Sequence, residues 1–314
     1  MTPHLVSVIV PMYNAADTIG EQIEALVAQD YPGAWELILA DNGSTDGTLE
    51  TIARDHPGLD AQIVIEDARR GAAHVRNAAV RHSRGDFLAF VDADDRVHPG
   101  WLTELVAASA GVDLVAGDIE TESLNTPEAR AARPLGSLAF VFDEPDFLPS
   151  ASGCNLGVRR ATFEAIDGFD PTFVVGQDVD FSWRAQLAGF TIRFAPRSVV
   201  AYRLRSDRDG IFRQMRGYGR GETKAYYRYR RFGAPRMPAR AKVALASFLV
   251  LRNPLVPAAI RGVSVERWFA ALGYVVGRVE EVPRARFNAS VTDRVPGRAG
   301  PSADDRADRL SSVR

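Results

Sequence analysis

Three carboxylates within four positions, Asp92, Asp94 and Asp95, follow an apolar run and could do chemistry. The run, Phe87 to Val91, is short, aromatic and β-branched, which predicts a buried strand. Chain polarity puts the acids at the carboxyl end of this strand, where ligands bind in open parallel α/β sheets. Because like charges this close repel one another, a cation or a cationic side chain is expected beside them. A solvated acidic turn without a ligand is the alternative for the cluster taken alone.

The composition is that of an ordinary globular protein. The chain has 314 residues, of which 46% are hydrophobic and 25% charged, with a formal net charge of −2. This length suits one large domain or two, and the charge indicates no general affinity for nucleic acid. The single cysteine, Cys154, excludes an internal disulfide, fits a reducing compartment and is expected to be a small core residue.

No targeting or membrane-spanning segment is predicted. The first residues lack a basic leader, and the apolar segment 243–260 is interrupted by Arg252, Asn253 and two prolines. The expected location is the cytoplasm.

Apolar runs alternate with stretches of helical spacing through residues 5–117. This alternation is typical of a mostly parallel sheet covered by helices on both faces, and it predicts an α/β fold. The Gly-x-Gly-x-x-Gly pattern of dinucleotide-binding folds does not follow the first strand, which disfavours a nicotinamide enzyme. We expect strands at 5–10, 35–40, 62–65, 86–91 and 112–116, and helices at 19–27, 46–54, 71–82 and 101–108.

The second half of the chain is less regular. Residues 119–149 contain several prolines and are expected to form an irregular connection. A helix is expected at 160–166, a second at 179–188, and a long basic helix at 209–231. Two short strands are expected at 190–194 and 199–202, and a last helix at 268–279. Residues 290–314 are polar and predict a disordered tail.

Five motifs in order resemble those of the family 2 glycosyltransferases, which have the GT-A fold. The resemblance covers about Leu5 to Gly221 and implies a nucleotide-sugar-binding half at 1–118 and an acceptor-side half at 119–232. A helical C-terminal extension would follow at 233–289. The motifs are Ser7 to Asn14, Asp41 to Thr48, Gly71 to Asn77, the DxD motif Asp92-Ala93-Asp94, and the acidic segment Gly176 to Arg184. The second of these is similar to the family's segment of an acid followed by Gly-Ser-Thr-Asp-Gly-Thr.

The resemblance implies a divalent cation, Mn²⁺ or Mg²⁺, at the DxD motif. These cations take hard oxygen ligands and neutralise the charge that develops on a departing diphosphate. We expect Asp94 to be the direct metal ligand. Asp92 would contact the ribose or a metal-bound water, and Asp95 would stabilise the turn or support the site from outside.

The resemblance also implies a binding site for a UDP-, GDP- or dTDP-sugar. An ionised Asp41 can accept a hydrogen bond from a nucleobase imino group, and Arg76 can offer two parallel donors to phosphate or to a carboxylate. A salt bridge at the surface is the alternative for Arg76, and Asp46 is expected to cap the helix that follows it. The expected donor-binding residues are Pro11, Tyr13, Asn14, Asp41, Gly71, Arg76, Asp92, Ala93 and Asp94.

Family 2 enzymes invert the anomeric carbon with one carboxylate as general base, and Asp178 is the candidate. The chain has Gln177 where the family usually has Glu, and Tyr202 near the place where many relatives have His. Asp180 is expected to be a first-turn acid of its helix. Further contacts to acceptor or phosphate are expected from Gln177, Trp183, Arg203 and Arg205.

Residues 203–242 hold 13 basic against three acidic residues, interleaved with aromatic ones. That composition suits an anionic membrane surface or a lipid-diphosphate acceptor, and a solvated helix face is the alternative. We therefore expect a glycan or lipid-linked acceptor and the transfer of a single sugar, with no nucleic-acid partner. The expected role is cell-surface polysaccharide or glycolipid synthesis, with a peripheral position on the inner face of the membrane. Two alternatives remain: a catalytically inactive domain that binds a nucleotide sugar or a partner, and a dehalogenase-type hydrolase, which the mid-chain place of the motif disfavours.

Overall fold

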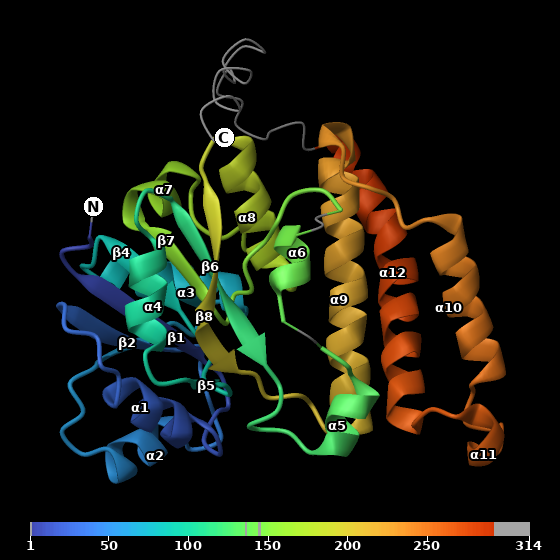
Figure 1. Cartoon of the computed structure of the whole chain (residues 1–314), viewed down its shortest axis with the longest axis horizontal. Helices are drawn as coiled ribbons and strands as arrows, with labels where there is room; N and C mark the ends of the chain where they lie inside the picture. The colour runs from blue at the N-terminus through green and yellow to red at the C-terminus, as the bar shows by residue number, and fades with distance from the viewer. Residues whose placement is uncertain (1, 136, 144–145, 292–314) are drawn as a thin grey trace.

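A computed structural model describes residues 2–135, 137–143 and 146–291. Within these residues, eight strands form one sheet, and helices cover it (Figure 1). The predicted α/β architecture with a mostly parallel sheet is confirmed. The strands are β1 Val6–Met12, β2 Trp35–Asp41, β3 Gln62–Ile65, β4 Phe87–Phe90, β5 Arg96–Val97, β6 Leu114–Glu120, β7 Leu156–Arg159 and β8 Ile192–Ala201.

The strand order in the sheet is β3-β2-β1-β4-β7-β6-β8-β5. β3, β2, β1 and β4 run parallel, as do β6 and β8, whereas β7 is antiparallel to both β4 and β6. The carboxyl ends of β1, β2 and β4 therefore meet at one edge of the sheet, which is where the predicted acidic loops lie.

Both faces of the sheet are buried, because successive strand residues point to opposite sides. Val8 and Val10 belong to one core with α1 (Ile19–Val27) and α4 (Trp101–Ala108), and Ile9 belongs to another with α3 (Ala72–His82), α7 (Arg160–Ala165) and α8 (Gln177–Leu187). The helices are α1 Ile19–Val27, α2 Thr48–Asp55, α3 Ala72–His82, α4 Trp101–Ala108, α5 Pro127–Ala132, α6 Ala139–Asp143, α7 Arg160–Ala165, α8 Gln177–Leu187, α9 Arg208–Tyr229, α10 Ala239–Leu251, α11 Ala258–Arg261 and α12 Val265–Val291, with a 3₁₀ turn at Arg230–Phe232.

Three expectations about the second half are corrected. The connection 119–149 contains two short helices, α5 and α6, and the first of these is capped by the Thr126 side chain. The two strands expected at 190–194 and 199–202 are one strand, β8, whose register on β6 jumps where Pro196, Arg197 and Ser198 have no partner in the β6 pairing. The last helix, α12, is longer than predicted. Residue 118, after which the boundary between the two halves is expected, lies in β6, and the domain division stays a prediction. Residues 292–314 of the predicted tail lie outside the described part.

The C-terminal helices α9, α12 and α10 lie side by side next to the sheet domain, with α10 outermost (Figure 1). In the described residues, no helix combines the length and the apolar character needed to cross a membrane. α9 and α12 pack closely because glycines face the opposing backbone. A Cβ on Gly277 would lie 2.0 Å from the Arg216 carbonyl oxygen, and one on Gly219 would lie 2.1 Å from that of Tyr274.

This contact predicts that Gly277→Ala destabilises the protein. A methyl group there must push the two helix backbones apart, and overpacking of this kind costs about 1–3 kcal/mol. Gly20→Ala in α1 is the matched control, because its Cβ would meet nothing closer than 3.6 Å and a helical alanine is favoured over glycine by about 1 kcal/mol. Urea unfolding of both variants measures the difference. Equal stability of Gly277→Ala and wild type would contradict the close packing.

Candidate active site

The loop after β4 joins Asp92 to a buried arginine. Arg76, on α3, is 2% exposed, and its Nη2 lies 2.5 Å from Asp92 Oδ1. The same nitrogen donates to the Gly153 carbonyl oxygen at 3.2 Å. Two other nitrogens of this guanidinium, Nε and Nη1, are buried without a partner among the described residues. Asp92 is thus fixed by a cation from a neighbouring helix, as the repulsion among the three acids leads one to expect.

The other two acids of the loop have different surroundings. Asp95 is buried, and its Oδ1 accepts a hydrogen bond from the Arg203 backbone nitrogen at 2.8 Å. Asp94 is partly exposed and pairs with Arg205 at 2.7 Å. Burial, together with the neighbouring Asp92 carboxylate, raises the pKa of Asp94, and burial and both neighbouring acids raise the pKa of Asp95 well above its usual value. A cation at this loop would relieve that repulsion.

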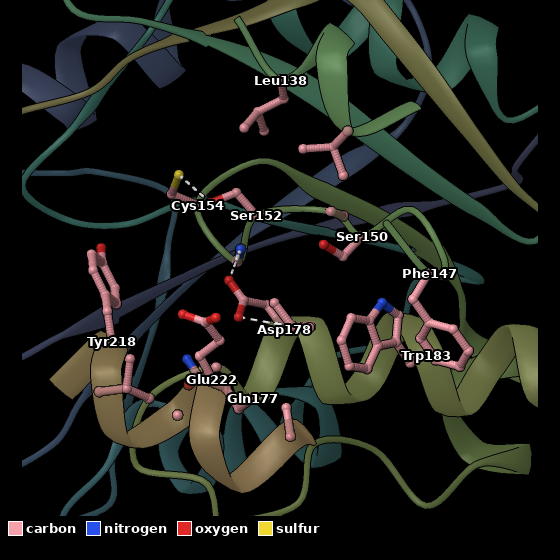
Figure 2. A pocket seen from close by; sticks show the side chains of 18 of the residues that line it. Leu138, Phe147, Ser150, Ser152, Cys154, Gln177, Asp178, Trp183, Tyr218 and Glu222 are labelled. Carbon is pink, nitrogen blue, oxygen red and sulfur yellow. Dashed lines mark hydrogen bonds between the residues drawn. The ribbon is translucent and has the colours of Figure 1, made fainter. Parts of the chain in front are cut away.

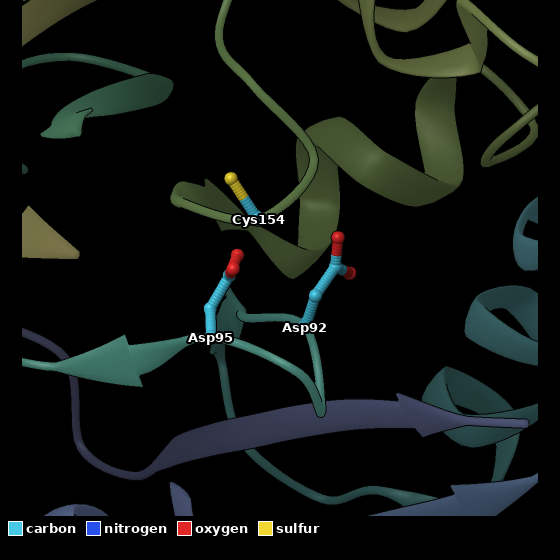
Figure 3. A group of neighbouring side chains, drawn as sticks. All are labelled: Asp92, Asp95 and Cys154. Atoms are coloured by element: carbon cyan, nitrogen blue, oxygen red, sulfur yellow. The ribbon is translucent and has the colours of Figure 1, made fainter. Parts of the chain in front are cut away.

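Cys154 lies beside this loop (Figure 3). Its Sγ and one carboxylate oxygen each of Asp92 and Asp95 lie within 4.8 Å of one another. Burial raises the pKa of the Cys154 thiol well above its usual value, so the sulfur stays protonated at neutral pH. A thiol is a poor ligand for Mn²⁺ or Mg²⁺. The oxygen donors of the loop fit a hard divalent cation, and Cys154 does not add to that set.

The predicted donor-side residues gather at the carboxyl ends of β1 and β2. Asp41 is buried and accepts from the Gly43 and Ser44 backbone nitrogens and from the Ser44 hydroxyl. Asn14, with a positive φ of 51°, bonds to Ser44 and Thr45. The turn 42–45 therefore holds the loops after β1 and β2 together, and Asp46 accepts from the Thr48 nitrogen at the start of α2.

Three further residues complete this donor side. The exposed Tyr13 ring lies under the Arg70 guanidinium at 4.4 Å, and the Gly71 nitrogen donates to the Asn42 side chain. Pro11 lies in β1 opposite Ala40. The chain thus presents an aromatic face, backbone groups and a cation at one loop cluster, which suits a nucleotide in shape and donor type.

A pocket of about 820 Å³ opens beside Asp92, between the sheet domain and α9 (Figure 2). It contains five of the predicted residues, and the others do not line it. Those in the pocket are Arg76, Asp92, Gln177, Asp178 and Trp183. The predicted residues outside it are Pro11, Tyr13, Asn14, Asp41, Gly71, Ala93, Asp94, Arg203 and Arg205.

Asp178 stands in this pocket at the first turn of α8, after the left-handed Gly176. Its Oδ2 accepts from the Gly153 nitrogen at 2.8 Å. Because the carbonyl oxygen of Gly153 accepts from Arg76, one residue links Asp178 to the Asp92–Arg76 pair. Asp180, by contrast, is fully buried, and Arg184, Arg228 and the Tyr229 hydroxyl hold its carboxylate. These contacts indicate a structural role for Asp180.

The remaining predicted pocket residues have distinct contacts. Gln177 is buried, and its side-chain oxygen has no partner among the described residues. The Trp183 indole donates to the Leu148 carbonyl oxygen at 2.8 Å and packs edge-on against Phe147 and Tyr229. Trp183 thus forms a fixed wall, and Gln177 offers an acceptor.

Sequence reasoning missed Arg133, which joins Tyr202 and Tyr218 in the pocket wall. Arg133 lies over the rings of Tyr218 and Tyr202, at 5.1 and 5.7 Å from their centroids, and bonds to Gln214. Gln214 and Tyr218 are four residues apart on α9 and share a face, which is a usable signal. Arg133 follows α5 in the irregular connection, where no periodicity marks it. Burial raises the pKa of Tyr202 well above its usual value, so a neutral phenol stands there.

The basic residues of α9 are largely compensated within the molecule. Arg208 pairs with Glu266, Arg216 and Arg220 pair with Glu280, and Arg228 pairs with Asp170 and Asp180. Arg203, just before the helix, pairs with Glu21. The local excess of basic residues therefore serves mainly to join α9 to α12 and α8.

Known proteins are similar to this chain in sequence and in fold. The model of the family described as "Glycosyl transferase family 2" matches residues 7–167. Glycosyltransferase AglE of Haloferax volcanii is 32% identical over 225 residues, covering 70% of this chain and 74% of AglE. Succinoglycan biosynthesis protein ExoA of Rhizobium meliloti is 28% identical over 285 residues, covering 86% and 84%. The structure of mannosyltransferase PcManGT of Pyrobaculum calidifontis in complex with GDP-Man and Mn²⁺ aligns with a TM-score of 0.62 at 23% identity, over 90% of this chain and 88% of that one, and shows a shared fold.

Proposed function

Because the chain belongs to glycosyltransferase family 2, we propose that it transfers a single sugar from a nucleoside-diphosphate sugar to an acceptor hydroxyl, with inversion at the anomeric carbon. One observation carries the proposal: Asp178 and Asp92 line the same pocket and are linked through Gly153 and Arg76. A carboxylate for the acceptor hydroxyl therefore stands close to the carboxylates expected at the donor diphosphate.

The donor side is proposed to bind the nucleotide at Tyr13, Asn14 and Asp41, with the diphosphate toward Asp92 and Asp94. PcManGT was solved with GDP-Man and Mn²⁺, which supports a divalent cation here. The cation would be held by Asp94, with Asp92 nearby, and would supply charge stabilisation to the leaving diphosphate. Arg205 is half-exposed, so it can turn from Asp94 to a phosphate when the cation binds.

The acceptor side is proposed to use Asp178 as general base. A base must lie within hydrogen-bonding reach of the attacking hydroxyl, and Asp178 already faces the pocket, held by the Gly153 nitrogen. Gln177 precedes Asp178 in the pocket lining and is proposed to contact the acceptor beside it. The name of ExoA, a succinoglycan biosynthesis protein, supports the proposal that this chain acts in polysaccharide synthesis.

A catalytically inactive domain that binds a nucleotide sugar is the second candidate. Gln177 and Tyr202 favour it, because each replaces a charged or metal-binding residue type that is usual in the family. The two candidates differ in turnover and share nucleotide binding, so the experiments below separate them.

We further propose that α10 contacts an anionic membrane surface. Val243, Val250 and Leu251 are exposed on this helix, and none of its residues is buried. Between residues 233 and 263 the chain has five basic residues and no acidic one. Exposed apolar side chains flanked by cations are typical of helices that lie in the membrane interface. Pro235 and Met237, which line the pocket, come just before α10, so the pocket would open near the lipid.

The metal proposal predicts that Asp94→Asn weakens nucleotide binding in Mn²⁺. Calorimetry of the wild type against UDP-, GDP- and dTDP-sugars first identifies the donor. For that donor, loss of a charged ligand is expected to weaken the Mn²⁺-dependent affinity roughly 10- to 100-fold. Asp55→Asn, an exposed acid at the end of α2, is the control. Unchanged Mn²⁺-dependent affinity in Asp94→Asn would show that the metal ligand is elsewhere.

The base proposal predicts that Asp178→Asn abolishes transfer while nucleotide affinity is retained. General base catalysis contributes about 10²- to 10⁴-fold, so transfer of labelled sugar to polyprenyl-diphosphate sugars should fall by that factor. Asp180→Asn provides the contrast. It removes a buried charge partner of Arg184 and Arg228, and such a loss destabilises a protein by about 3–5 kcal/mol. Wild-type turnover in Asp178→Asn would refute the assignment, and nucleotide binding without turnover in the wild type would favour the inactive domain.

The membrane proposal predicts that the double variant Val250→Asp, Leu251→Asp floats with phosphatidylglycerol vesicles at least about tenfold less than wild type. Each substitution removes apolar surface worth about 1.5–3 kcal/mol when buried and adds a repelled charge. Val27→Asp, at the exposed end of α1, should float as wild type does. Wild-type protein that stays at the bottom of the gradient would contradict the proposal.

A further inference from the structure

Arg133 is a buried cation on the wall of the pocket. It is 8% exposed, and among the described residues no acidic side chain forms an ion pair with it. The other two arginines that line the pocket are compensated: Arg76 pairs with Asp92 at 2.5 Å and Arg278 with Glu222 at 2.7 Å. A buried charge without a counter-ion is costly unless a ligand or polar groups offset it.

Neutral groups hold Arg133 in place. Its Nη1 donates to the Gln214 side-chain oxygen at 2.5 Å, and its Nη2 donates to the Tyr218 hydroxyl at 3.2 Å. The rings of Tyr218 and Tyr202 lie against the guanidinium. A guanidinium has five N–H donors, and these two hydrogen bonds use two of them. The contacts fix the side chain and leave its charge and remaining donors for a partner.

The pocket of Arg133 does not include the loops expected to bind the nucleoside. None of the loop residues Tyr13, Asn14, Asp41 and Gly71 lines it, whereas Asp178, Asp92 and Arg76 do. The lining also includes apolar side chains of the connection 135–148 and of the segment before α10, which are Leu135, Leu138, Val141, Leu148, Pro235 and Met237. The cation therefore shares its cavity with Asp92, with the candidate base Asp178 and with a surface suited to hydrocarbon.

We propose that Arg133, held by Gln214 and Tyr218, binds a phosphate or diphosphate group of the acceptor. The inference rests on the proposed function, because it places the acceptor in the pocket of Asp178. A forked guanidinium matches the geometry of phosphate oxygens, and the Tyr202 and Tyr218 hydroxyls can donate to the same group. Anchoring the anion at Arg133 would orient an acceptor hydroxyl toward Asp178. The phosphate can belong to a lipid carrier or to a free glycosyl phosphate.

Calorimetry with the full chain in EDTA tests the site, since the chelator suppresses diphosphate binding through a divalent cation. The probes are farnesyl diphosphate, inorganic pyrophosphate and farnesol. Wild type is expected to bind the two diphosphates and to bind farnesol much more weakly. Arg133→Gln should weaken both diphosphates roughly 10- to 100-fold, the range for lost hydrogen bonds to a charged group. Arg130→Gln is the matched control, because Arg130 lies three residues earlier, is partly exposed and pairs with Glu122.

The results separate the two sources of phosphate. Tighter binding of farnesyl diphosphate than of pyrophosphate, with both dependent on Arg133, indicates a lipid carrier, and equal binding indicates a free glycosyl phosphate. Three results would overturn the proposed anion site. These are unchanged diphosphate binding in Arg133→Gln, an equal loss of diphosphate affinity in Arg130→Gln, and no diphosphate binding by wild type. If Arg133→Gln does not fold by circular dichroism, Tyr218→Phe decides, with a several-fold loss expected and no loss contradicting the site.

The same experiments keep this inference apart from the proposed function. A wild type that binds no nucleotide sugar, yet binds farnesyl diphosphate through Arg133, would refute sugar transfer and leave the anion site standing. A wild type that transfers sugar with Arg133-independent diphosphate binding would remove the anion site alone. Sugar transfer by Arg133→Lys, measured as KM against kcat, should show a raised KM for a phosphorylated acceptor, because lysine keeps the charge and loses the fork.

Discussion

The ion pair between Arg76 and Asp92 is the interaction on which the site depends. It joins α3 to the loop after β4, and the same guanidinium nitrogen reaches the Gly153 carbonyl oxygen. The Gly153 nitrogen in turn holds Asp178. A Cβ on Gly153 would lie 2.9 Å from Arg76 Nη1, so a larger residue here would displace the guanidinium from its present position. One buried cation and one glycine residue thus set the spacing between the carboxylate expected at the donor and the candidate base.

Ion pairs between neighbouring helices hold α9 in place beside this site. Acidic residues on α12 and α8 neutralise the arginines of α9, and close glycine contacts bring α9 and α12 together. α9 can then carry Tyr218 and Glu222 into the pocket, because ion pairs and close packing already hold the face of the helix that meets α12. The C-terminal extension therefore acts as a rigid support for one wall of the pocket.

Sequence patterns predicted the sheet and the acidic loops because both depend on local order. Apolar runs define β1, β2 and β4; Asp41 ends β2, and Asp92 lies two residues after β4. The pocket depends on contacts between segments that are distant in the sequence, such as Arg76 with Gly153. The spacing of residues along the chain does not predict such contacts. Arg133 lies in a proline-containing connection without periodicity, so its burial against Tyr202 could not be foreseen. Similarly, the sequence showed an excess of basic residues in α9 but not that these arginines pair with acidic residues of α12.

Gln177 and Tyr202, the two departures from the family pattern, have a common physical consequence. A carboxylate at position 177 would stand next to Asp178 in a buried place, and its charge would need a cation. The neutral amide avoids this repulsion and leaves Asp178 as the single acid of that turn facing the pocket, since Asp180 is held in the core. Tyr202, kept neutral by burial, packs against Arg133 at 5.7 Å. The glutamine therefore removes a negative charge, and the tyrosine removes a metal-binding side chain, from the lining of the pocket that contains Arg133.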